Sequence, residues 1–410
     1  MMNVLINAYA VNPDWGSEQG MGWNWVINLA KFCHVDVITE GEFRKNIERE
    51  LKNLPQKDNI RFHYLPVSDK VREMCWNQGD WRFYLYYRKW QKRALRCAKY
   101  IIENYHIDVI HQLNMIGFRE PGYLWKIENI PFIWGPVGGM EMMPMSYLNR
   151  ISSIQRIFNS IKNVINYFQY KYSPRVRSAI KRSDIIISAV QGVQTVLRDN
   201  YHKDSILINE TGVEINSDII KVHSSQNKPL KIIWVGKFDF RKQLPLALRS
   251  IIAMNKKDVE FHICGYGSKK NAQEMLNIAQ AGGISSICHW HGNIPNTEVR
   301  HLMAESDILF FTSIMEATST VVLEAISVGL PILCFNTCGF GPIVKNFAGI
   351  TIDLSDPNKS VTHFAEELLS VYNNRERLNE ISKKIISKRE SLTWEAKAFK
   401  TVQLYKSLVN

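Results

Sequence analysis

The sequence predicts an α/β fold made of two Rossmann-like, doubly wound domains that face each other across a cleft. Its 410 residues are too many for one compact core, which favours two domains. Short apolar runs alternate with helical patterns, as in the βαβ units of a parallel sheet. A polar segment at 214–229 interrupts the alternation once, and it then starts again. We expect ligands at the carboxyl ends of both sets of strands.

The expected strands form one set before the polar segment and one set after it. Each is a short apolar run bounded by polar or turn residues. The first set is 3–9, 35–39, 60–65, 108–112, 132–135, 184–189 and 205–208, and the second is 231–236, 259–264, 286–291, 307–312, 331–335 and 349–352.

The composition is that of a globular protein, with 45% hydrophobic and 22% charged residues. No stretch approaches the roughly 18 apolar residues of a membrane span. The first residues lack a basic region and are expected to form a strand, not a signal peptide. Seven cysteines without a Cys-x-x-Cys pair argue against a disulfide framework and favour a reducing cytoplasm.

Two glutamates in the stretch 307–331 are candidates for chemistry. A buried strand is expected to end near Ser313, and a helix to begin at Ser319 or Thr320 and end before Gly329. Glu316 then lies in the loop and Glu324 lies in the helix among apolar residues. Such an acid needs partners, and sugar hydroxyls are suitable ones. The alternative is a loop-capping Glu316 and a surface Glu324.

The backbone N–H groups of Thr320 and Val321, at the start of this helix, could meet a phosphate. Lys237 and Lys242 follow the first strand of the second half and could clamp a diphosphate, stabilising charge on a leaving group. The alternative is a solvated basic loop. Gly265, in a Gly-Tyr-Gly turn after the next strand, is weak evidence on its own.

This second half resembles the retaining glycosyltransferases of family 4, which have the GT-B architecture. Glu316 and Glu324 match the family's spaced pair of glutamates, and Lys242 matches its lysine, while Lys237 stands in place of an arginine. The resemblance implies that Glu316 faces the donor sugar as a catalytic residue and that Glu324 binds the ribose. It also implies that Gly265 lets the backbone approach the nucleotide. Ala317-Thr318-Ser319 departs from the family's glycine-containing loop.

The first half resembles one branch of the same family at two glycine-rich segments. Residues 16–25 are similar to its Gly-Ser-Glu-Pro-Gly-Val-Gly-Trp signature, which implies that Gly20 and Met21 approach the donor pyrophosphate. The alternative is a plain strand-to-helix turn. Residues 135–139 are similar to its Gly-Pro-Val-Gly-Gly loop, which places Gly138 and Gly139 near the acceptor.

Three further residues of the first half are candidates. Arg119 and Glu141 are acceptor-side possibilities. His111 ends a strand where the family often has His-x-His, and it is either a catalytic or a structural histidine.

The resemblance implies a domain plan: an acceptor-side domain at 1–213, a linker at 214–229, a nucleotide-sugar-binding domain at 230–390, and a terminal helix within 391–410 that packs back on the first domain. No Asp-x-Asp pair occurs, so we expect neither a metal nor another cofactor. The histidines 289 and 291 lack an evident third ligand, and we expect them to pack rather than bind metal.

The formal net charge is +12. Residues 76–93 interleave aromatic and cationic side chains, and residues 150–182 contain Lys and Arg without any acid. These stretches suit an anionic membrane surface, and the alternative is a helix with its aromatics in the core. No nucleic-acid motif accompanies them, so nucleic acid is not an expected partner.

The resulting prediction is a retaining, metal-independent hexosyl- or N-acetylhexosaminyltransferase. It would move sugar from a UDP- or GDP-sugar to a glycan or lipid-linked acceptor in cell-surface polysaccharide or lipopolysaccharide synthesis. We expect it in the cytoplasm, peripheral to the inner face of the membrane. The alternatives are a non-catalytic nucleotide-sugar-binding protein and an NAD-dependent oxidoreductase. The missing G-x-G-x-x-G fingerprint argues against the oxidoreductase.

Overall fold

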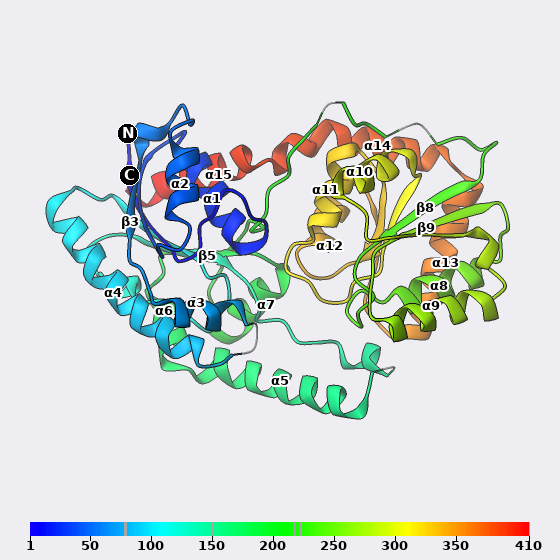
Figure 1. The fold of residues 1–410 in the computed structure, drawn as a ribbon, viewed down its shortest axis with the longest axis horizontal. Helices are drawn as coiled ribbons and strands as arrows, with labels where there is room; N and C mark the ends of the chain where they lie inside the picture. The colour runs from blue at the N-terminus through cyan, green and yellow to red at the C-terminus, as the bar shows by residue number, and fades with distance from the viewer. Residues whose placement is uncertain (78–79, 150, 217, 222–223, 410) are drawn as a thin grey trace. The chain divides into compact units, whose positions relative to one another are not determined.

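The computed structural model describes residues 1–77, 80–149, 151–216, 218–221 and 224–409. The chain divides into two compact units (Figure 1). One consists of Met1–Glu141, Val164–Thr211 and Trp394–Asn410, and the other of Met142–Asn163 and Gly212–Thr393. Residues 142–163 therefore group with the second unit, whereas the sequence analysis assigned them to the first domain.

The first unit is built on a sheet of parallel strands in the order β3-β2-β1-β4-β5-β6-β7, the doubly wound arrangement expected from the sequence. Each strand overlaps a predicted one. The strands are β1 (Asn3–Ala8), β2 (His34–Thr39), β3 (Ile60–Tyr64), β4 (Val109–Asn114), β5 (Phe132–Val137), β6 (Ile185–Ser188) and β7 (Ile206–Leu207).

Alternation along β1 separates two hydrophobic clusters. Val4 and Ile6 belong to the cluster that includes α1 and α15, while Leu5 belongs to the cluster that includes α4, α6 and α7. The helices that lie wholly within this unit are α1 (Ser17–Leu29), α2 (Arg44–Leu51), α3 (Asp69–Trp76), α4 (Phe83–Asn104), α6 (Pro174–Arg182), α7 (Gln191–Tyr201) and α15 (Trp394–Val409).

The second unit repeats the topology, with parallel strands in the order β10-β9-β8-β11-β12-β13. Figure 1 shows α8, α9 and α13 on one side of this sheet and α10, α11 and α12 on the other. The strands are β8 (Leu230–Val235), β9 (Val259–Cys264), β10 (Cys288–Gly292), β11 (Ile308–Phe311), β12 (Ile332–Phe335) and β13 (Ile350–Ile352).

The helices of the second unit include α11, whose ends follow the predicted signals. Ser319 occupies the N-cap position and Gly329 ends the helix with φ of 83°. The helices are α8 (Leu244–Met254), α9 (Lys269–Ala281), α10 (Asn296–Glu305), α11 (Thr320–Val328), α12 (Phe340–Asn346), α13 (Pro357–Asn373) and α14 (Glu376–Lys388). A further helix, α5 (Ser153–Tyr172), starts in residues of the second unit and ends in residues of the first.

The predicted linker at 214–229 groups with the second unit and forms no helix or strand in its described part. Ser224 anchors this segment to the second unit. Its N–H donates to Asn379 Oδ1 at 2.9 Å, and its hydroxyl donates to Asp307 Oδ1 at 2.5 Å. Residues 217, 222 and 223 of the linker lie outside the described residues.

His111 on β4 joins α15 to the interior of the first unit. Its Nε2 lies 2.7 Å from the carbonyl oxygen of Gly135, and its Nδ1 lies 2.6 Å from the hydroxyl of Tyr405 on α15. Because a carbonyl only accepts, Nε2 carries the hydrogen and Nδ1 accepts from the tyrosine. The side chain is fully buried, and burial lowers the pKa of His111 to about 4. The neutral ring is therefore the native form.

This environment predicts how stability depends on pH. The unfolded chain binds a proton at His111 near pH 6.5, and the folded chain binds it only near pH 4. Compared with His111→Gln, the wild type should lose stability as the pH falls from 6.5 towards 4, by about 3 kcal/mol in total. Urea unfolding of both proteins across this range measures the difference. If the free energies of unfolding of the two proteins changed with pH in parallel, the His111 ring would not titrate as described.

Candidate functional site

A cavity of about 250 Å³ lies at the carboxyl ends of β8, β9 and β10 and beside the start of α11. Parallel strands of a doubly wound sheet present their loops at this edge, which is where such folds bind ligands. The cavity brings together five residues singled out from the sequence, which are Lys237, Gly265, Thr320, Val321 and Glu324.

Gly265 is required where β8 and β9 meet at the cavity. Its φ is +154°, and a β-carbon there would lie 1.8 Å from the carbonyl oxygen of Gly236. Its N–H donates to the carbonyl of Gly292 at 2.7 Å. The glycine thus joins the loops after three strands and leaves backbone exposed to a ligand.

Glu324 has one partner that the sequence did not reveal. Asn296, at the first position of α10, donates its Nδ2 hydrogen to Glu324 Oε1 at 2.9 Å. This bond fixes the carboxylate, which is partly exposed, at the cavity wall. Asn296 is close to Glu324 only after folding, because 28 residues separate them in the chain.

Tyr266 is another cavity residue that was not singled out from the sequence. Its ring is 47% exposed, and Lys237 Nζ lies 5.8 Å from the ring centroid. An exposed aromatic face beside a cation suits a planar heterocycle with a phosphate attached to it. The sequence contained an indication of this residue, because Tyr266 lies between the two glycines of the Gly-Tyr-Gly turn, but only the glycine Gly265 was interpreted.

Lys242 and Glu316 form an ion pair next to this cavity. Lys242 Nζ lies 2.6 Å from Glu316 Oε1, and both side chains are largely buried. The Ser313 hydroxyl also donates to Glu316 Oε1, at 3.2 Å. The Lys242 side chain reaches the cavity wall, since a β-carbon at Gly236 would lie 3.3 Å from it.

The start of α11 carries an unpaired polar atom. Ser319 Oγ is buried and has no hydrogen-bond partner in the described residues. The N–H groups of Thr320 and Val321 follow it at the cavity wall, where the helix dipole favours an anion. A phosphate oxygen is a suitable acceptor for this hydroxyl.

Three stacked histidines lie elsewhere on this sheet. His262 on β9 stacks against His289 and His291 on β10, with ring centroids 4.9 and 5.2 Å apart. In the described part of the chain, no three His, Cys, Asp or Glu side chains are placed to hold a metal ion.

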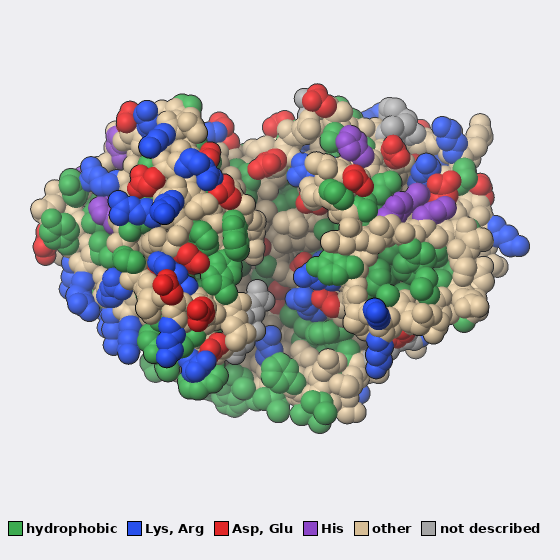
Figure 2. Space-filling model, viewed as in Figure 1, with side chains coloured by type: hydrophobic (Ala, Val, Ile, Leu, Met, Phe, Trp, Pro, Cys, Tyr) green, Lys and Arg blue, Asp and Glu red, His purple; other side chains and the backbone are tan. Residues whose placement is uncertain are grey.

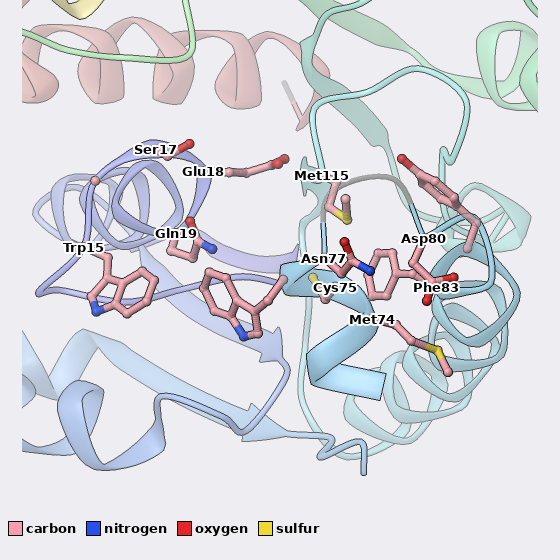
Figure 3. A pocket seen from close by; sticks show the side chains of 13 residues that line it. Trp15, Ser17, Glu18, Gln19, Met74, Cys75, Asn77, Asp80, Phe83 and Met115 are labelled. Atoms are coloured by element: carbon pink, nitrogen blue, oxygen red, sulfur yellow. The ribbon is translucent and has the colours of Figure 1, made fainter. Parts of the chain in front are cut away.

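The first unit contains a larger cavity of about 630 Å³, which Figure 3 shows between the start of α1 and residues at the end of α3 and the start of α4. Glu18 and Gln19 lie on one side, and Asn77 and Phe83 lie on the other. Two exposed indoles, Trp15 and Trp76, line it with ring centroids 4.9 Å apart.

Glu18 is the titratable group of most interest in this cavity. Its Oε1 accepts the N–H of Ile116 at 2.6 Å. Burial raises the pKa of Glu18 to about 7. A carboxyl group that exchanges its proton near neutral pH, facing a cavity, is suited to contacts with hydroxyl groups.

Gly20 and Met21, predicted to approach the donor, lie in buried turns of α1. A β-carbon at Gly20 would lie 2.1 Å from the carbonyl oxygen of Trp15, so close packing accounts for this glycine. Neither residue lines the neighbouring cavity. Their role towards a donor stays a prediction.

His111 has no free ring nitrogen, and its side chain is fully buried. A proton-transfer residue needs access to the reacting group, so this geometry is that of a structural histidine. Of the two roles that the sequence allows for His111, catalytic or structural, we adopt the structural one.

Gly138, Gly139 and Arg119 come together near α5. Gly139 has φ of +82°, and a β-carbon there would lie 3.7 Å from the Arg119 guanidinium. That guanidinium donates to Gln169 at 2.7 Å and to Asn166, both on α5. Arg119 thus holds α5 in place, and an acceptor-side role for these three residues stays a prediction.

The aromatic and cationic stretch at 76–93 is not one helix, because α3 ends at Trp76 and α4 starts at Phe83. Gln78 and Gly79 lie outside the described residues. Tyr87 and Trp90 are buried in the core, as the alternative reading held, whereas Trp81 and Tyr84 are exposed. Among described residues, no helix is long and apolar enough to span a bilayer.

Residues 216–388 match the sequence model of the family described as Glycosyl transferases group 1. This segment lies within the second unit and contains the cavity and ion pair described above. The glycine-rich segments of the first unit lie outside the match.

Curated proteins resemble parts of the chain. The chain is 24% identical over 151 residues to the amylovoran biosynthesis glycosyltransferase AmsK of Erwinia amylovora, covering 35% of this chain and 37% of that protein. It is 27% identical over 133 residues to the phosphatidylinositol N-acetylglucosaminyltransferase GPI3 subunit of Saccharomyces cerevisiae, covering 32% and 28%. The chain therefore spans 28–37% of the length of these two relatives.

Solved structures resemble the whole chain. Sucrose-phosphate synthase from Thermosynechococcus elongatus aligns over 100% of this chain and 99% of its own, with a TM-score of 0.60 and 14% identity. Anabaena HepE in complex with UDP aligns over 99% and 100%, with a TM-score of 0.62 and 11% identity. At these identities the likeness is one of fold, and with two doubly wound parallel sheets the chain has the GT-B fold.

Proposed function

We propose that this protein is a glycosyltransferase that takes a sugar from a nucleoside diphosphate sugar bound in the cavity of the second unit. The observation that carries the proposal is the grouping of Lys237, Glu324 and the start of α11 around one cavity, inside the segment that matches Glycosyl transferases group 1. Carboxylate, cations and helix amides are the groups that a ribose and a diphosphate require.

Each part of the donor nucleotide is assigned to a group of the protein that lies at or near the cavity. Glu324, fixed by Asn296, accepts hydrogen bonds from the ribose hydroxyls. Tyr266 packs on the base, and the amides of Thr320 and Val321 with the Ser319 hydroxyl meet the diphosphate. The nucleotide in the Anabaena HepE structure is UDP, which supports a UDP-sugar as the first donor to test, with a GDP-sugar as the second.

Lys242 and Glu316 are assigned to the reacting end of the donor. Lys242 turns from Glu316 to the leaving diphosphate and stabilises the charge that grows there, and Glu316 holds the sugar. The bond from the anomeric carbon to the phosphate oxygen breaks as the bond to the acceptor oxygen forms on the same face. Because the acceptor oxygen attaches on the face that the leaving group vacates, the anomeric configuration is retained, and the acceptor proton passes to a phosphate oxygen.

The charges of the diphosphate are matched by lysines and helix amides in this assignment, which is why we propose a metal-independent reaction. We assign as acceptor a glycan or lipid-linked saccharide of a cell-surface polysaccharide; one relative of the chain is named for amylovoran biosynthesis. We assign it to the cavity of the first unit, where two indoles can pack on sugar rings and Glu18 can bond hydroxyls. Seven cysteines without a Cys-x-x-Cys pair suit a cytoplasmic location.

Removing the Glu324 carboxylate should weaken nucleotide binding. Glu324→Ala should raise the Kd for UDP by roughly 10- to 100-fold, because one or two hydrogen bonds to a charged group are lost. Asn296→Ala should weaken binding less, since it only frees the carboxylate. Titration calorimetry measures both, with exposed Glu366→Ala as the control. An unchanged Kd in Glu324→Ala would remove the ribose assignment.

The ion pair should matter for turnover more than for binding. Lys242→Ala and Glu316→Ala should each lower kcat by roughly 100-fold or more, because both act on charge that develops during transfer. Glu316→Ala should leave the Kd for UDP near that of the wild type. Lys383→Ala, an exposed lysine outside the cavity, is the matched control. The release of UDP measures the rates of both sugar transfer and donor hydrolysis.

Two results of that assay would overturn the proposal. Wild-type turnover in both variants would show that the pair takes no part in the reaction. UDP binding by the wild type without transfer or hydrolysis, for any donor and acceptor tried, would instead favour a non-catalytic nucleotide-sugar-binding protein.

A further inference from the structure

Helix α5 has its polar and apolar faces reversed. A helix on the surface of a globular protein packs its apolar face on the core and turns its polar face to water. In α5 the side chains that face the protein include three asparagines, and most of the large aliphatic and aromatic side chains face solvent. The exposed ones are Ile154, Ile157, Phe158, Ile161, Val164, Ile165, Phe168 and Tyr172, each between 49% and 79% exposed.

Hydrogen bonds from asparagines of the inward face hold α5 in place, together with Tyr170, which packs in the core near the end of the helix. Asn163 donates to the carbonyl of Met143 and accepts from its N–H, both at 2.9 Å. Asn166 donates to the carbonyl of Glu141 at 3.2 Å and accepts from Arg119. These bonds fix which side of the helix points outward.

The exposed residues form one continuous surface. They recur at spacings of three and four, so at 100° per residue they fall within an arc of about 120°. The stripe follows nearly the whole 20-residue helix, which is about 30 Å long. In Figure 2 hydrophobic side chains gather along the lower margin, where Figure 1 places α5. Isolated exposed apolar residues are common, but a stripe of this length marks a binding surface.

Charge indicates what the stripe binds. α5 contains Arg156, Lys162 and Lys171 and no acidic residue, and α6, which follows it, is also free of acids. Lys162 and Lys171 flank the apolar arc on either side by helical spacing. Arg150, also in this acid-free stretch, lies outside the described residues.

We infer that α5 docks the protein on an anionic lipid bilayer. The helix lies in the plane of the interface, with its apolar stripe among the acyl chains and its lysines at the anionic headgroups. A second copy of the chain fits less well, because two such helices face to face would offer no acid to pair with their cations. The inference specifies the surface on which the proposed enzyme works, but its evidence is α5 alone and does not depend on transfer.

The test is co-sedimentation with vesicles of phosphatidylcholine, with and without phosphatidylglycerol, in the absence of substrate. The wild type should sediment with the anionic vesicles, and increasing salt should weaken this binding. The triple variant Phe158→Ser/Ile161→Ser/Phe168→Ser should lower the partition coefficient by about tenfold or more, because it removes three of the eight exposed apolar side chains that would enter the bilayer. Leu276→Ser/Phe399→Ser, exposed apolar residues elsewhere, should leave it unchanged.

A second pair of variants isolates the charge. Lys162→Gln/Lys171→Gln should weaken binding to anionic vesicles and make it less sensitive to salt, whereas the exposed pair Lys383→Gln/Lys384→Gln should not. UDP titration of every variant shows whether the fold and the donor site are intact. A wild type that binds vesicles but not UDP would refute the proposed function and leave the docking surface standing.

Three results would overturn the docking inference. The wild type fails to sediment with anionic vesicles, or the triple variant sediments as the wild type does. The third result is a dimer of the wild type in light scattering that the triple variant no longer forms, with no vesicle binding by the wild type. That result would assign the apolar stripe to contact with a second copy of the chain.

Discussion

The contact between the loops after β8 and β11 organises the candidate donor site. The Lys242–Glu316 ion pair joins the two loops. Thr312 supports it by donating its hydroxyl to the carbonyl of Lys242 at 2.7 Å while accepting from Trp234 Nε1 at 3.0 Å. A largely buried pair needs such fixed geometry, since its desolvation is costly. These contacts hold Lys242 and Glu316 at the edge of the cavity that Glu324 lines. A diphosphate bound there can replace the Glu316 carboxylate as the partner of the Lys242 ammonium group.

The sequence predicted the architecture because the signals of βαβ units are local. The strands before and after the polar segment overlap β1–β13, since each is an apolar run of β-forming residues bounded by turns. The limits of α11 followed from Ser319, which stands at the N-cap position without a side-chain capping bond, and from Gly329, whose positive φ ends the helix. The residues that line the cavity of the second unit were also identifiable, because in a parallel sheet the residues just after consecutive strands meet at one edge.

What the sequence could not supply depends on contacts between distant residues. The partnership of Asn296 with Glu324 and the burial of His111 against Tyr405 exist only in the folded chain. The stripe of α5 is different. Its helical periodicity was visible, but periodicity does not tell which face is inward. Only the hydrogen bonds of Asn163 and Asn166 show that the polar face packs on the protein.

The central claim is that one cavity of the second unit holds a nucleoside diphosphate through Glu324 at the ribose and through lysines and the start of α11 at the phosphates. A crystal structure of the protein with UDP-glucose, and a second with GDP-mannose, tests it most directly. The account predicts that one nucleotide occupies this cavity with its ribose hydroxyls bonded to Glu324 and its diphosphate beside Lys242 and Thr320. A bound nucleotide whose diphosphate lies away from Lys242, or whose ribose does not contact Glu324, would contradict it.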